Sequence, residues 1–323
     1  MSTLILSACG GEGGGKESLE FISNGDGTCY VSGIGTYKDT VNVIIPETSP
    51  EGDTVTGIGY GAFADIGDTL TTISIPDTIT SIDDNAFAYC ENLTYNVYED
   101  VKYLGNEQNP YMVLIKPTSR DEETYTIHPD TKFLYTNAFW LCENLTNITI
   151  PGKVISIGMD AFSQCTQLKE LIIPEGVTTL GKDAFYACRA LTKLSVPNSL
   201  TSIGDDTFAW LTMIEETEYN GMYYIGNDDN PYVVLMWAKG DIAPNCALHP
   251  NTKFVFDGAF FGCNLTSVVI PKSMIYIGEG AFDENNNLTD VYYTGTEAEW
   301  GAIKFDRDNR HVKNATIHYN YGN

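Results

Sequence analysis

Positively charged residues are scarce in this sequence. The 323 residues include 18 Lys and Arg against 43 Asp and Glu, which gives a net charge of −25 with neutral histidine. A surface this acidic repels phosphate backbones and anionic lipid headgroups. The composition therefore argues against nucleic-acid binding and against docking on a membrane through a basic patch. Acidity by itself names no partner.

The sequence also lacks long apolar runs and chemical motifs. No stretch approaches the ~20 apolar residues that a membrane-spanning helix needs. There is no nucleophile elbow, no Ser/His/Asp pattern and no pair of carboxylates in a recognisable frame. The four histidines and the Asp pairs, such as Asp83-Asp84, do not follow a metal-ligand spacing. We therefore expect no enzyme activity, no cofactor and no metal site.

What the sequence does contain is an internal repeat. The dipeptide Ala-Phe, replaced once by Thr-Phe, recurs at steps of about 23 residues and twice at steps of 52. Most units also carry an Ile-Pro or Val-Pro pair, an Ile-Gly or Leu-Gly pair, a Cys and a Leu at fixed offsets. Such self-similarity is typical of stacked-repeat proteins. The recurring aromatic residues are Phe63, Phe87, Phe139, Phe162, Phe185, Phe208, Phe260 and Phe282.

The positions within one unit predict one coil of chain. Leu145 to Ile150 alternates apolar and polar residues, which indicates a strand with one buried face. The proline after it ends the strand, because proline cannot donate the next ladder hydrogen bond. The later glycine suits a corner of the coil. Phe162, Cys165 and Leu168 are three residues apart, which predicts a short helical turn.

A single coil cannot bury its own apolar positions, so the coils are expected to stack. At the ~4.8 Å spacing of paired strands, Phe lies over Phe and Ile over Ile in one continuous core. Cys29 and Cys246 fall outside the pattern, and the sequence leaves open whether they form a disulfide. The other recurring cysteines should form a buried column of free thiols: Cys90, Cys142, Cys165, Cys188 and Cys263.

The repeat resembles a known family. The unit reads approximately Ile-Pro, Val, Ile-Gly, Ala-Phe, Cys and Leu, with two residues between successive positions. This resembles the BspA-type leucine-rich repeat of bacterial surface proteins, from about Val43 to Leu288. The resemblance implies a right-handed leucine-rich-repeat solenoid, mostly β with short helical turns. We expect about eight coils of about 23 residues within residues 43–290.

Both ends of the solenoid carry segments that can cap it. Leu19 to Ile22 and Thr28 to Val31 flank Asn-Gly-Asp-Gly, which predicts a hairpin within an N-terminal cap at residues 19–42. Residues 291–323 are expected to form a C-terminal cap. There, Thr296 and Glu299 fit a capping box that opens a short helix, and a final strand follows.

Residues 1–18 resemble the start of a bacterial lipoprotein. Leu6-Ser7-Ala8-Cys9 matches a lipobox, whose Cys is acylated, and the glycine-rich stretch after it suits a tether. The match departs from a normal signal peptide, because the apolar part is short and no Lys or Arg precedes it. We expect an extracytoplasmic protein, lipid-anchored at the bacterial cell surface through Cys9, or a secreted one if Cys9 is not acylated.

The two 52-residue steps match each other at an offset of 121 residues. In both, apolar strands flank an Asn/Gly/Pro turn, which predicts one β-hairpin insertion near residues 95–124 and another near residues 216–245. These insertions carry Tyr111, Tyr232 and Trp237. Exposed aromatic residues can be binding hot spots. The alternative is that they pack back on the solenoid.

A solenoid presents a broad face of outward strand residues. The family resemblance implies adhesion, so we expect a non-catalytic, monomeric surface protein that binds an extracellular protein or glycan of a host or microbe. Two alternatives remain: a passive spacer that self-associates, and a glycan-acting enzyme with two carboxylates about 5–10 Å apart. The expected contact residues on the strand face are Asn147, Thr149, Glu170, Ile172, Lys193 and Ser195.

Overall fold

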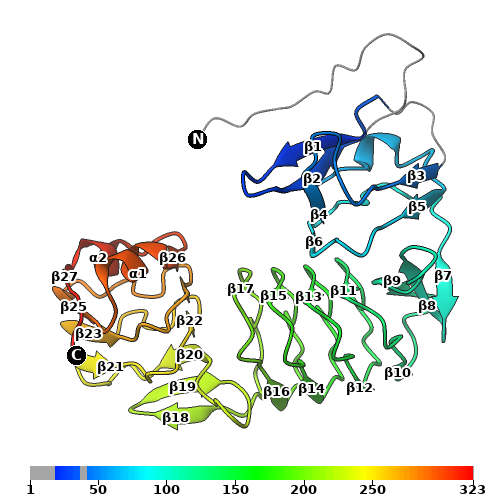
Figure 1. Cartoon of the computed structure of the whole chain (residues 1–323). Helices are drawn as coiled ribbons and strands as arrows, with labels where there is room; N and C mark the ends of the chain where they lie inside the picture. The colour runs from blue at the N-terminus through cyan, green and yellow to red at the C-terminus, as the bar shows by residue number, and fades with distance from the viewer. Residues whose placement is uncertain (1–18, 37–41, 323) are drawn as a thin grey trace. The chain divides into compact units, whose positions relative to one another are not determined.

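The computed structural model describes residues 19–36 and 42–322. The chain divides into two compact units, Met1–Cys165 and Thr166–Asn323. Both units consist of short strands joined by tight turns, as Figure 1 shows. Cys9 and the glycine-rich stretch after it lie outside the described residues.

In the first unit, the strands of successive coils pair in parallel. β11 pairs with β13 and β10 pairs with β12, and the partners are 23 residues apart in each case. Equivalent positions of successive repeats therefore lie side by side. The elements are β1 (Glu20–Ser23), β2 (Thr28–Gly33), β3 (Asn42–Ile44), β4 (Thr54–Ile58), the 3-10 helix η1 (Ala64–Ile66), β5 (Thr72–Ser74), β6 (Ser81–Ile82), β7 (Asn96–Tyr98), β8 (Val101–Leu104), β9 (Val113–Pro117), β10 (Thr124–Tyr125), β11 (Phe133–Leu134), β12 (Asn147–Ile148) and β13 (Ser156–Ile157).

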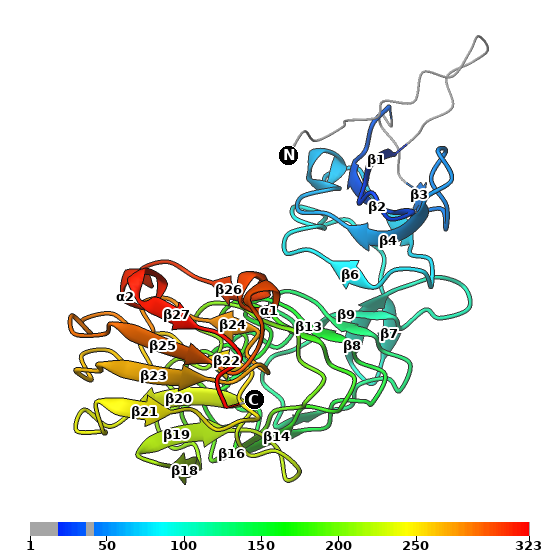
Figure 2. The same ribbon diagram turned by 60° about the vertical axis from the view of Figure 1, so that its left-hand side comes forward.

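The second unit repeats this arrangement. β14 pairs in parallel with β16, and β21, β23, β25 and β27 form a sheet of parallel neighbours, seen in Figure 2. The elements are β14 (Glu170–Ile172), β15 (Thr179–Leu180), β16 (Lys193–Ser195), β17 (Ser202–Ile203), β18 (Thr217–Tyr219), β19 (Met222–Ile225), β20 (Val234–Ala238), β21 (Asn245–Ala247), β22 (Phe254–Val255), β23 (Ser267–Ile270), β24 (Tyr276–Ile277), β25 (Asp290–Tyr293), α1 (Glu297–Ala302), β26 (Lys304–Phe305), α2 (Arg310–Asn314) and β27 (Thr316–His318).

The recurring phenylalanines form the core, as predicted. All eight are buried, with at most 8% of any of them exposed. Phe139 and Phe162 stack with ring centroids 5.3 Å apart and planes 12° from parallel, and Phe260 and Phe282 stack at 4.9 Å. The cysteines of the repeat are buried thiols outside any disulfide, and so are Cys29 and Cys246. The fold is therefore the expected solenoid of stacked coils.

The segment around each phenylalanine differs from the predicted helical turn. Asn137 and Leu141, two residues before and after Phe139, have φ of 61° and 60°. An α-helix needs φ near −63° at every residue, so these left-handed positions prevent one. The Cys142 N–H still donates to the Phe139 carbonyl at 3.0 Å, while the Phe139 N–H donates to Ala161 in the next coil at 2.7 Å. The result is a tight turn that also links two coils.

The long steps change the coil count. Each holds a hairpin and an additional coil, and the described part of the chain makes about 12 turns in all, not the eight expected. β7, β8 and β9 pair antiparallel in succession, and β9 then pairs in parallel with β11. β18, β19, β20 and β22 repeat the same pattern. The last strand of each hairpin is thus a rung of the solenoid. In the aromatic stack, Tyr135 follows Phe87 at 5.4 Å, and Phe256 follows Phe208 at 5.9 Å.

The ends of the described chain contain the predicted cap elements. β1 and β2 form an antiparallel hairpin whose turn contains Gly25 and Gly27, both with positive φ, and β2 pairs with β4. At the other end, Thr296 opens α1: its hydroxyl accepts the Glu299 N–H, and the Glu299 carboxylate accepts the Thr296 N–H at 2.7 Å. The final strand β27 pairs in parallel with β25.

Candidate binding surfaces

The expected contact residues of the first unit lie on its surface. Asn147 on β12 and Thr149 just after it are exposed, while Ile148 between them is buried. Together with Thr124 and Thr126 they line a shallow cavity of about 450 Å³. Hydroxyl and amide groups can both donate and accept hydrogen bonds, so this surface can contact a polar ligand.

The expected contact residues of the second unit lie on paired strands. Glu170 on β14 is opposite Lys193 on β16, and Ile172 is opposite Ser195. Glu170, Ile172 and Lys193 are exposed, Ser195 is half-buried, and Leu171 between them points into the core. Ile172 is 65% exposed, which is unusual for so large an apolar side chain. That these residues contact a ligand stays a prediction.

Tyr111 and Tyr232 occupy equivalent places in two aromatic clusters. The Tyr111 ring lies 4.1 Å from the His128 ring, and Tyr232 stacks on His249 at 3.7 Å. Both tyrosines are half-buried. In the first cluster, the hydroxyl of buried Tyr103 accepts the His128 N–H at 3.1 Å, and burial raises the pKa of Tyr103 to about 12. This geometry supports the alternative that the two tyrosines pack back on the solenoid.

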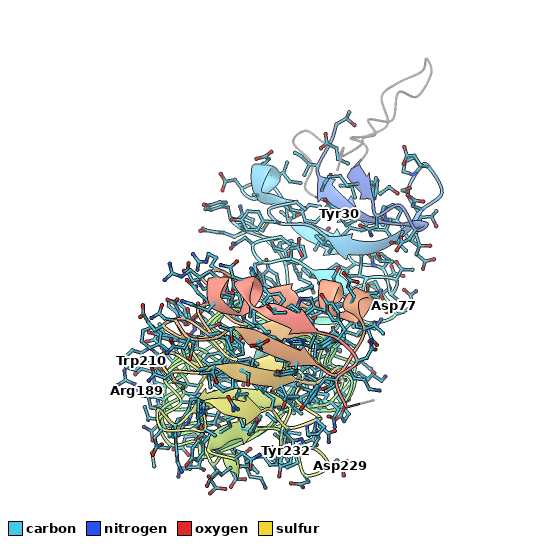
Figure 3. All side chains as sticks on the ribbon, turned by 90° about the vertical axis from the view of Figure 1, so that its left-hand side faces the viewer. Tyr30, Asp77, Arg189, Trp210, Asp229 and Tyr232 are labelled. Carbon is cyan, nitrogen blue, oxygen red and sulfur yellow. The ribbon has the colours of Figure 1, made fainter. Side chains whose placement is uncertain are left out.

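Trp237 is partly exposed but already engaged. Its ring stacks on Tyr223 with centroids 4.0 Å apart and planes 9° from parallel, and its Nε1 donates to the Glu216 carboxylate at 2.9 Å. Burial raises the pKa of Glu216, and the bond from Trp237 opposes that shift. Lys239 Nζ lies 5.3 Å from the Tyr223 ring centroid. A more exposed aromatic residue of this unit is Trp210, 61% exposed and labelled in Figure 3.

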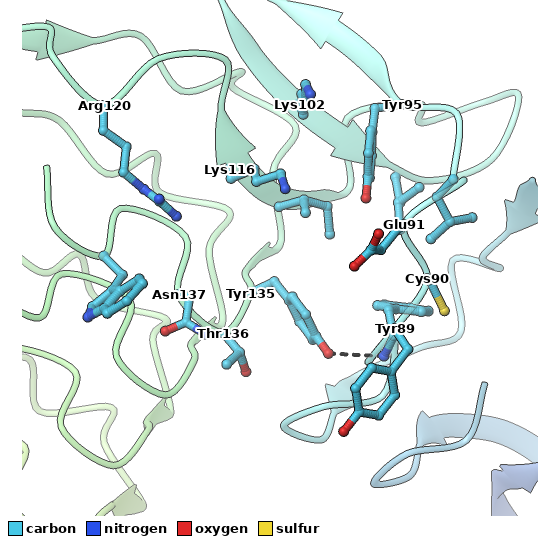
Figure 4. A pocket seen from close by; sticks show the side chains of 15 residues that line it. Tyr89, Cys90, Glu91, Tyr95, Lys102, Lys116, Arg120, Tyr135, Thr136 and Asn137 are labelled. Atoms are coloured by element: carbon cyan, nitrogen blue, oxygen red, sulfur yellow. Dashed lines mark hydrogen bonds between the residues drawn. The ribbon is translucent and has the colours of Figure 1, made fainter. Parts of the chain in front are cut away.

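In the first hairpin, cationic side chains occupy the positions that correspond to Tyr223 and Trp237. Lys102 on β8 lies directly opposite Lys116 on β9, and Arg120 follows the end of β9. These three residues and the rings of Tyr95 and Trp140 line a cavity of about 570 Å³, shown in Figure 4. We call this the cationic cavity. Sequence reasoning did not identify it.

Aromatic rings hold two of these cations. Lys102 Nζ lies 5.5 Å from the Tyr95 ring centroid, and the Arg120 guanidinium lies 5.5 Å from that of Trp140. Among the described residues, no carboxylate lies within 4.0 Å of a nitrogen of Lys102, Lys116 or Arg120. A ring attracts a cation without neutralising its charge. The cavity therefore keeps three positive charges in a strongly acidic chain.

Two hydroxyl side chains in the lining of the cationic cavity are fixed by hydrogen bonds. The Tyr135 hydroxyl accepts the Phe87 N–H at 3.1 Å, and burial raises the pKa of Tyr135. The Thr136 hydroxyl donates to Asp84 at 2.8 Å. Glu91 adds one carboxylate to the wall, on the side of Tyr95 in Figure 4. The lining thus combines cations, ring faces and hydrogen-bonding groups.

The internal duplication held a signal that could have identified this site. At the offset of 121 residues, the framework tyrosines and histidine of the hairpin are kept. The three cations are all replaced. Their counterparts in the second hairpin are Tyr223, Trp237 and Asp241.

A pair of carboxylates that the sequence did not reveal lies in the second unit. Burial, followed by the nearby Asp306 carboxylate, raises the pKa of Asp205. The Tyr276 hydroxyl donates to Asp306 at 2.9 Å, and the Arg307 N–H donates to the same carboxylate at 2.7 Å. These bonds tie the pair into the stacked turns, which gives it a structural role.

Residues 19–36 and 42–322 lack two further kinds of feature. No group of three or more His, Cys, Asp or Glu side chains in these ranges could hold a metal ion. No helix there has the length and apolar character needed to cross a bilayer.

Several solved structures are similar to this chain. A leucine rich cell surface protein from Faecalibacterium prausnitzii is 19% identical, with 95% of this chain and 99% of that one covered and a TM-score of 0.32. A leucine-rich repeat protein from Bacteroides ovatus is 21% identical, with 95% and 78% covered and a TM-score of 0.36. The T. pallidum leucine rich repeat protein is 20% identical, with 66% and 86% covered and a TM-score of 0.40.

Comparison with curated proteins found no match. In contrast, the model of the BspA type leucine rich repeat region matches in six copies, over residues 40–108, 132–228 and 243–320. These ranges contain most of the chain and the recurring phenylalanines of the core. The chain belongs to the BspA-type leucine-rich repeat family.

Proposed function

We propose that this chain is a non-catalytic binding protein of the bacterial cell surface. Its ligand would be an extracellular protein or glycan of a host or microbe, held on the outward face of the strands. One observation carries the proposal: outward residues of the paired strands, such as Glu170 and Ile172, are exposed while Leu171 between them is buried. Repetition of this alternation gives a surface whose chemistry varies without disturbing the core.

Membership in a family of leucine-rich repeat surface proteins supports this role and an extracellular location. Attachment through an acylated Cys9 is part of the proposal. It is tested by expressing the chain and a Cys9→Ser variant in a bacterium and following labelled fatty acid. Label on the parent chain alone supports the anchor, and label on neither chain contradicts it.

The binding proposal is tested with an array of extracellular matrix proteins and glycans. The probe is the Cys9→Ser chain, and the variants are Glu170→Ala with Ile172→Ala, and Asn147→Ala with Thr149→Ala. A matched control is Tyr60→Ala, which removes a side chain that is 72% exposed elsewhere in the chain. Saturable binding that falls in at least one face variant, and not in the control, is expected.

The passive-spacer alternative predicts a different result. Sedimentation at several concentrations would then show self-association, and the array would show no ligand. A binding protein of the proposed kind sediments as a monomer.

A further inference from the structure

We propose that the cationic cavity binds an acidic carbohydrate, that is, a sugar chain bearing carboxylate or sulfate groups. The cavity lies between β8, β9 and the turn that carries Trp140, and it shares no residue with the strand face. The inference therefore goes beyond the proposed function. Either site can bind without the other.

Two lysines of the cavity are placed unfavourably in the ligand-free protein. Lys102 and Lys116 are directly opposite on antiparallel strands. Like charges in that relation repel each other, and the sheet is less stable for it. No carboxylate of the described residues lies close enough to pair with either one. An anion bound between them would supply the missing partner.

The duplicated hairpin of the second unit carries a different pair at these positions. There, Tyr223 and Trp237 are opposite each other in the same register and stack face to face, and Glu216 accepts the Trp237 Nε1–H. The framework therefore folds with a self-contained aromatic pair at these two positions. The lysines of the first hairpin are not required by the fold, so a role outside folding explains them better.

The charge of the chain and the lining of the cavity favour one class of anionic ligand. Nucleic acids and anionic membranes present dense negative charge, which a chain with a net charge of −25 repels. In many acidic carbohydrates, the charged groups are separated by neutral, hydroxyl-rich sugar surface. Arg and Lys pair well with a single carboxylate or sulfate group. The remaining lining suits the neutral part, because Asn137 and Glu91 can bond to hydroxyls and Tyr89, 76% exposed, offers a ring face.

The size of the cavity agrees with this class. Its volume of about 570 Å³ falls in the range of about 300–1,000 Å³ that is usual for small-molecule sites. A neighbouring cavity of about 520 Å³ is lined by the same three cations, together with Ser119 and Asp121. The same three cations therefore line two neighbouring cavities, which suits an elongated ligand that extends from one to the other.

The test measures binding of tetrasaccharides to the Cys9→Ser chain by calorimetry. The probes are a glucuronate-containing tetrasaccharide, a sulfated tetrasaccharide and a neutral maltotetraose. The key variant is Lys102→Tyr with Lys116→Trp, which installs the pair that the second hairpin already carries. The matched control is Lys272→Tyr with Lys304→Trp, which removes the same charge from exposed sites in the second unit.

We expect the parent chain and the control to bind at least one acidic tetrasaccharide and not maltotetraose. We expect at least a tenfold loss of affinity in Lys102→Tyr with Lys116→Trp, whose fold is checked by circular dichroism, and a similar loss in Arg120→Asp. The carboxylated and sulfated probes show which anionic group the cavity takes.

Three results would overturn the proposal. One is equal affinity for acidic and neutral sugars, and another is unchanged affinity in both cavity variants. The third is stronger binding to polyglutamate or to phosphatidylglycerol vesicles than to either acidic sugar. The face variants of the preceding section serve as a cross-check. If the cavity variants keep their affinity for the acidic tetrasaccharides while the face variants lose binding on the array, this site is rejected and the proposed function stands.

Discussion

Lys102 and Lys116 face each other across β8 and β9, and the residues at the same two places in the second hairpin, Tyr223 and Trp237, stack with ring centroids 4.0 Å apart. One backbone framework thus supports a repelling pair in one copy and an attracting pair in the other. The difference lies in the side chains, because the strand register and the bulge next to it are the same in both copies.

Replacing Lys116 with Gln should stabilise the ligand-free protein. Removing a like charge that lies directly opposite Lys102 should raise the free energy of unfolding by about 0.2–1 kcal/mol at low salt. The gain should shrink in 1 M salt, where charges are screened within about 3 Å. Urea denaturation measures both effects. Lys304→Gln, on an exposed strand residue of the second unit, should give no gain, and an equal gain there would contradict the explanation.

Removing one ring from the aromatic core should be severe. Phe162 is fully buried and stacks on Phe139. Phe162→Ala loses the burial of the ring and leaves a cavity, so it should lower the free energy of unfolding by about 3–5 kcal/mol. Tyr60→Ala, at an exposed position of the same unit, should change it by less than about 0.5 kcal/mol. Urea denaturation followed by circular dichroism compares the two variants.

The buried thiols predict a pH dependence of stability. Burial raises the pKa of Cys90 and of Cys142 from 9.0 to about 11. The unfolded chain therefore releases these protons first as the pH rises, so the folded state binds more protons in this range. The contribution to stability is fully present below pH 9 and is lost between pH 9 and about 11.

Urea denaturation of the reduced protein at pH 8, 9.5 and 10.5 measures this loss. The difference in stability between the parent chain and Cys142→Ala should narrow as the pH rises. A difference that stays constant over this range would contradict the assignment. At pH 8.5, the native Cys9→Ser chain should also resist iodoacetamide and react only after unfolding, because its remaining cysteines are buried and the thiolate is the reactive form.

The capping box of α1 gives a local prediction. Thr296→Ala removes the hydroxyl that accepts the Glu299 N–H, and such a loss lowers stability by about 0.5–2 kcal/mol. Thr296→Ser keeps the hydroxyl and should be close to the parent chain. Amide hydrogen exchange at Glu299 reports the effect directly. Equal exchange in the Ala and Ser variants would show that the cap does not hold this helix.

Much of the fold could be predicted from the sequence, because many of its features follow from patterns within a single coil. Local patterns in the sequence predict the buried phenylalanines and cysteines of the repeat, the Gly25–Gly27 hairpin and the Thr296 cap. The structure confirms each of these features. The turns around Phe139 could not be predicted from residue spacing. Positions three residues apart fit a helix, whereas φ of 61° at Asn137 and 60° at Leu141 is set by hydrogen bonds to the next coil.

Residue spacing within one repeat could not predict the cationic cavity, for a related reason. Lys102 and Lys116 meet only because β8 and β9 pair in one register, and a bulge beside Lys102 shifts that register by one residue. A shift of one residue moves a side chain to the other face of the sheet. Tyr135, which lines the cavity, was not expected there because it stands where most repeats have a glycine. Its counterpart at the offset of 121 residues is Phe256, which also replaces that glycine.

A crystal structure of the full chain, soaked with the acidic tetrasaccharide that binds best, locates the bound sugar. We predict that a carboxylate or sulfate oxygen lies within hydrogen-bonding distance of at least two of Lys102, Lys116 and Arg120. We also predict that the Tyr223–Trp237 pair stays stacked and unoccupied. A sugar found at Tyr223 and Trp237, or bound in the first hairpin without contact to any of the three cations, would contradict the proposed site.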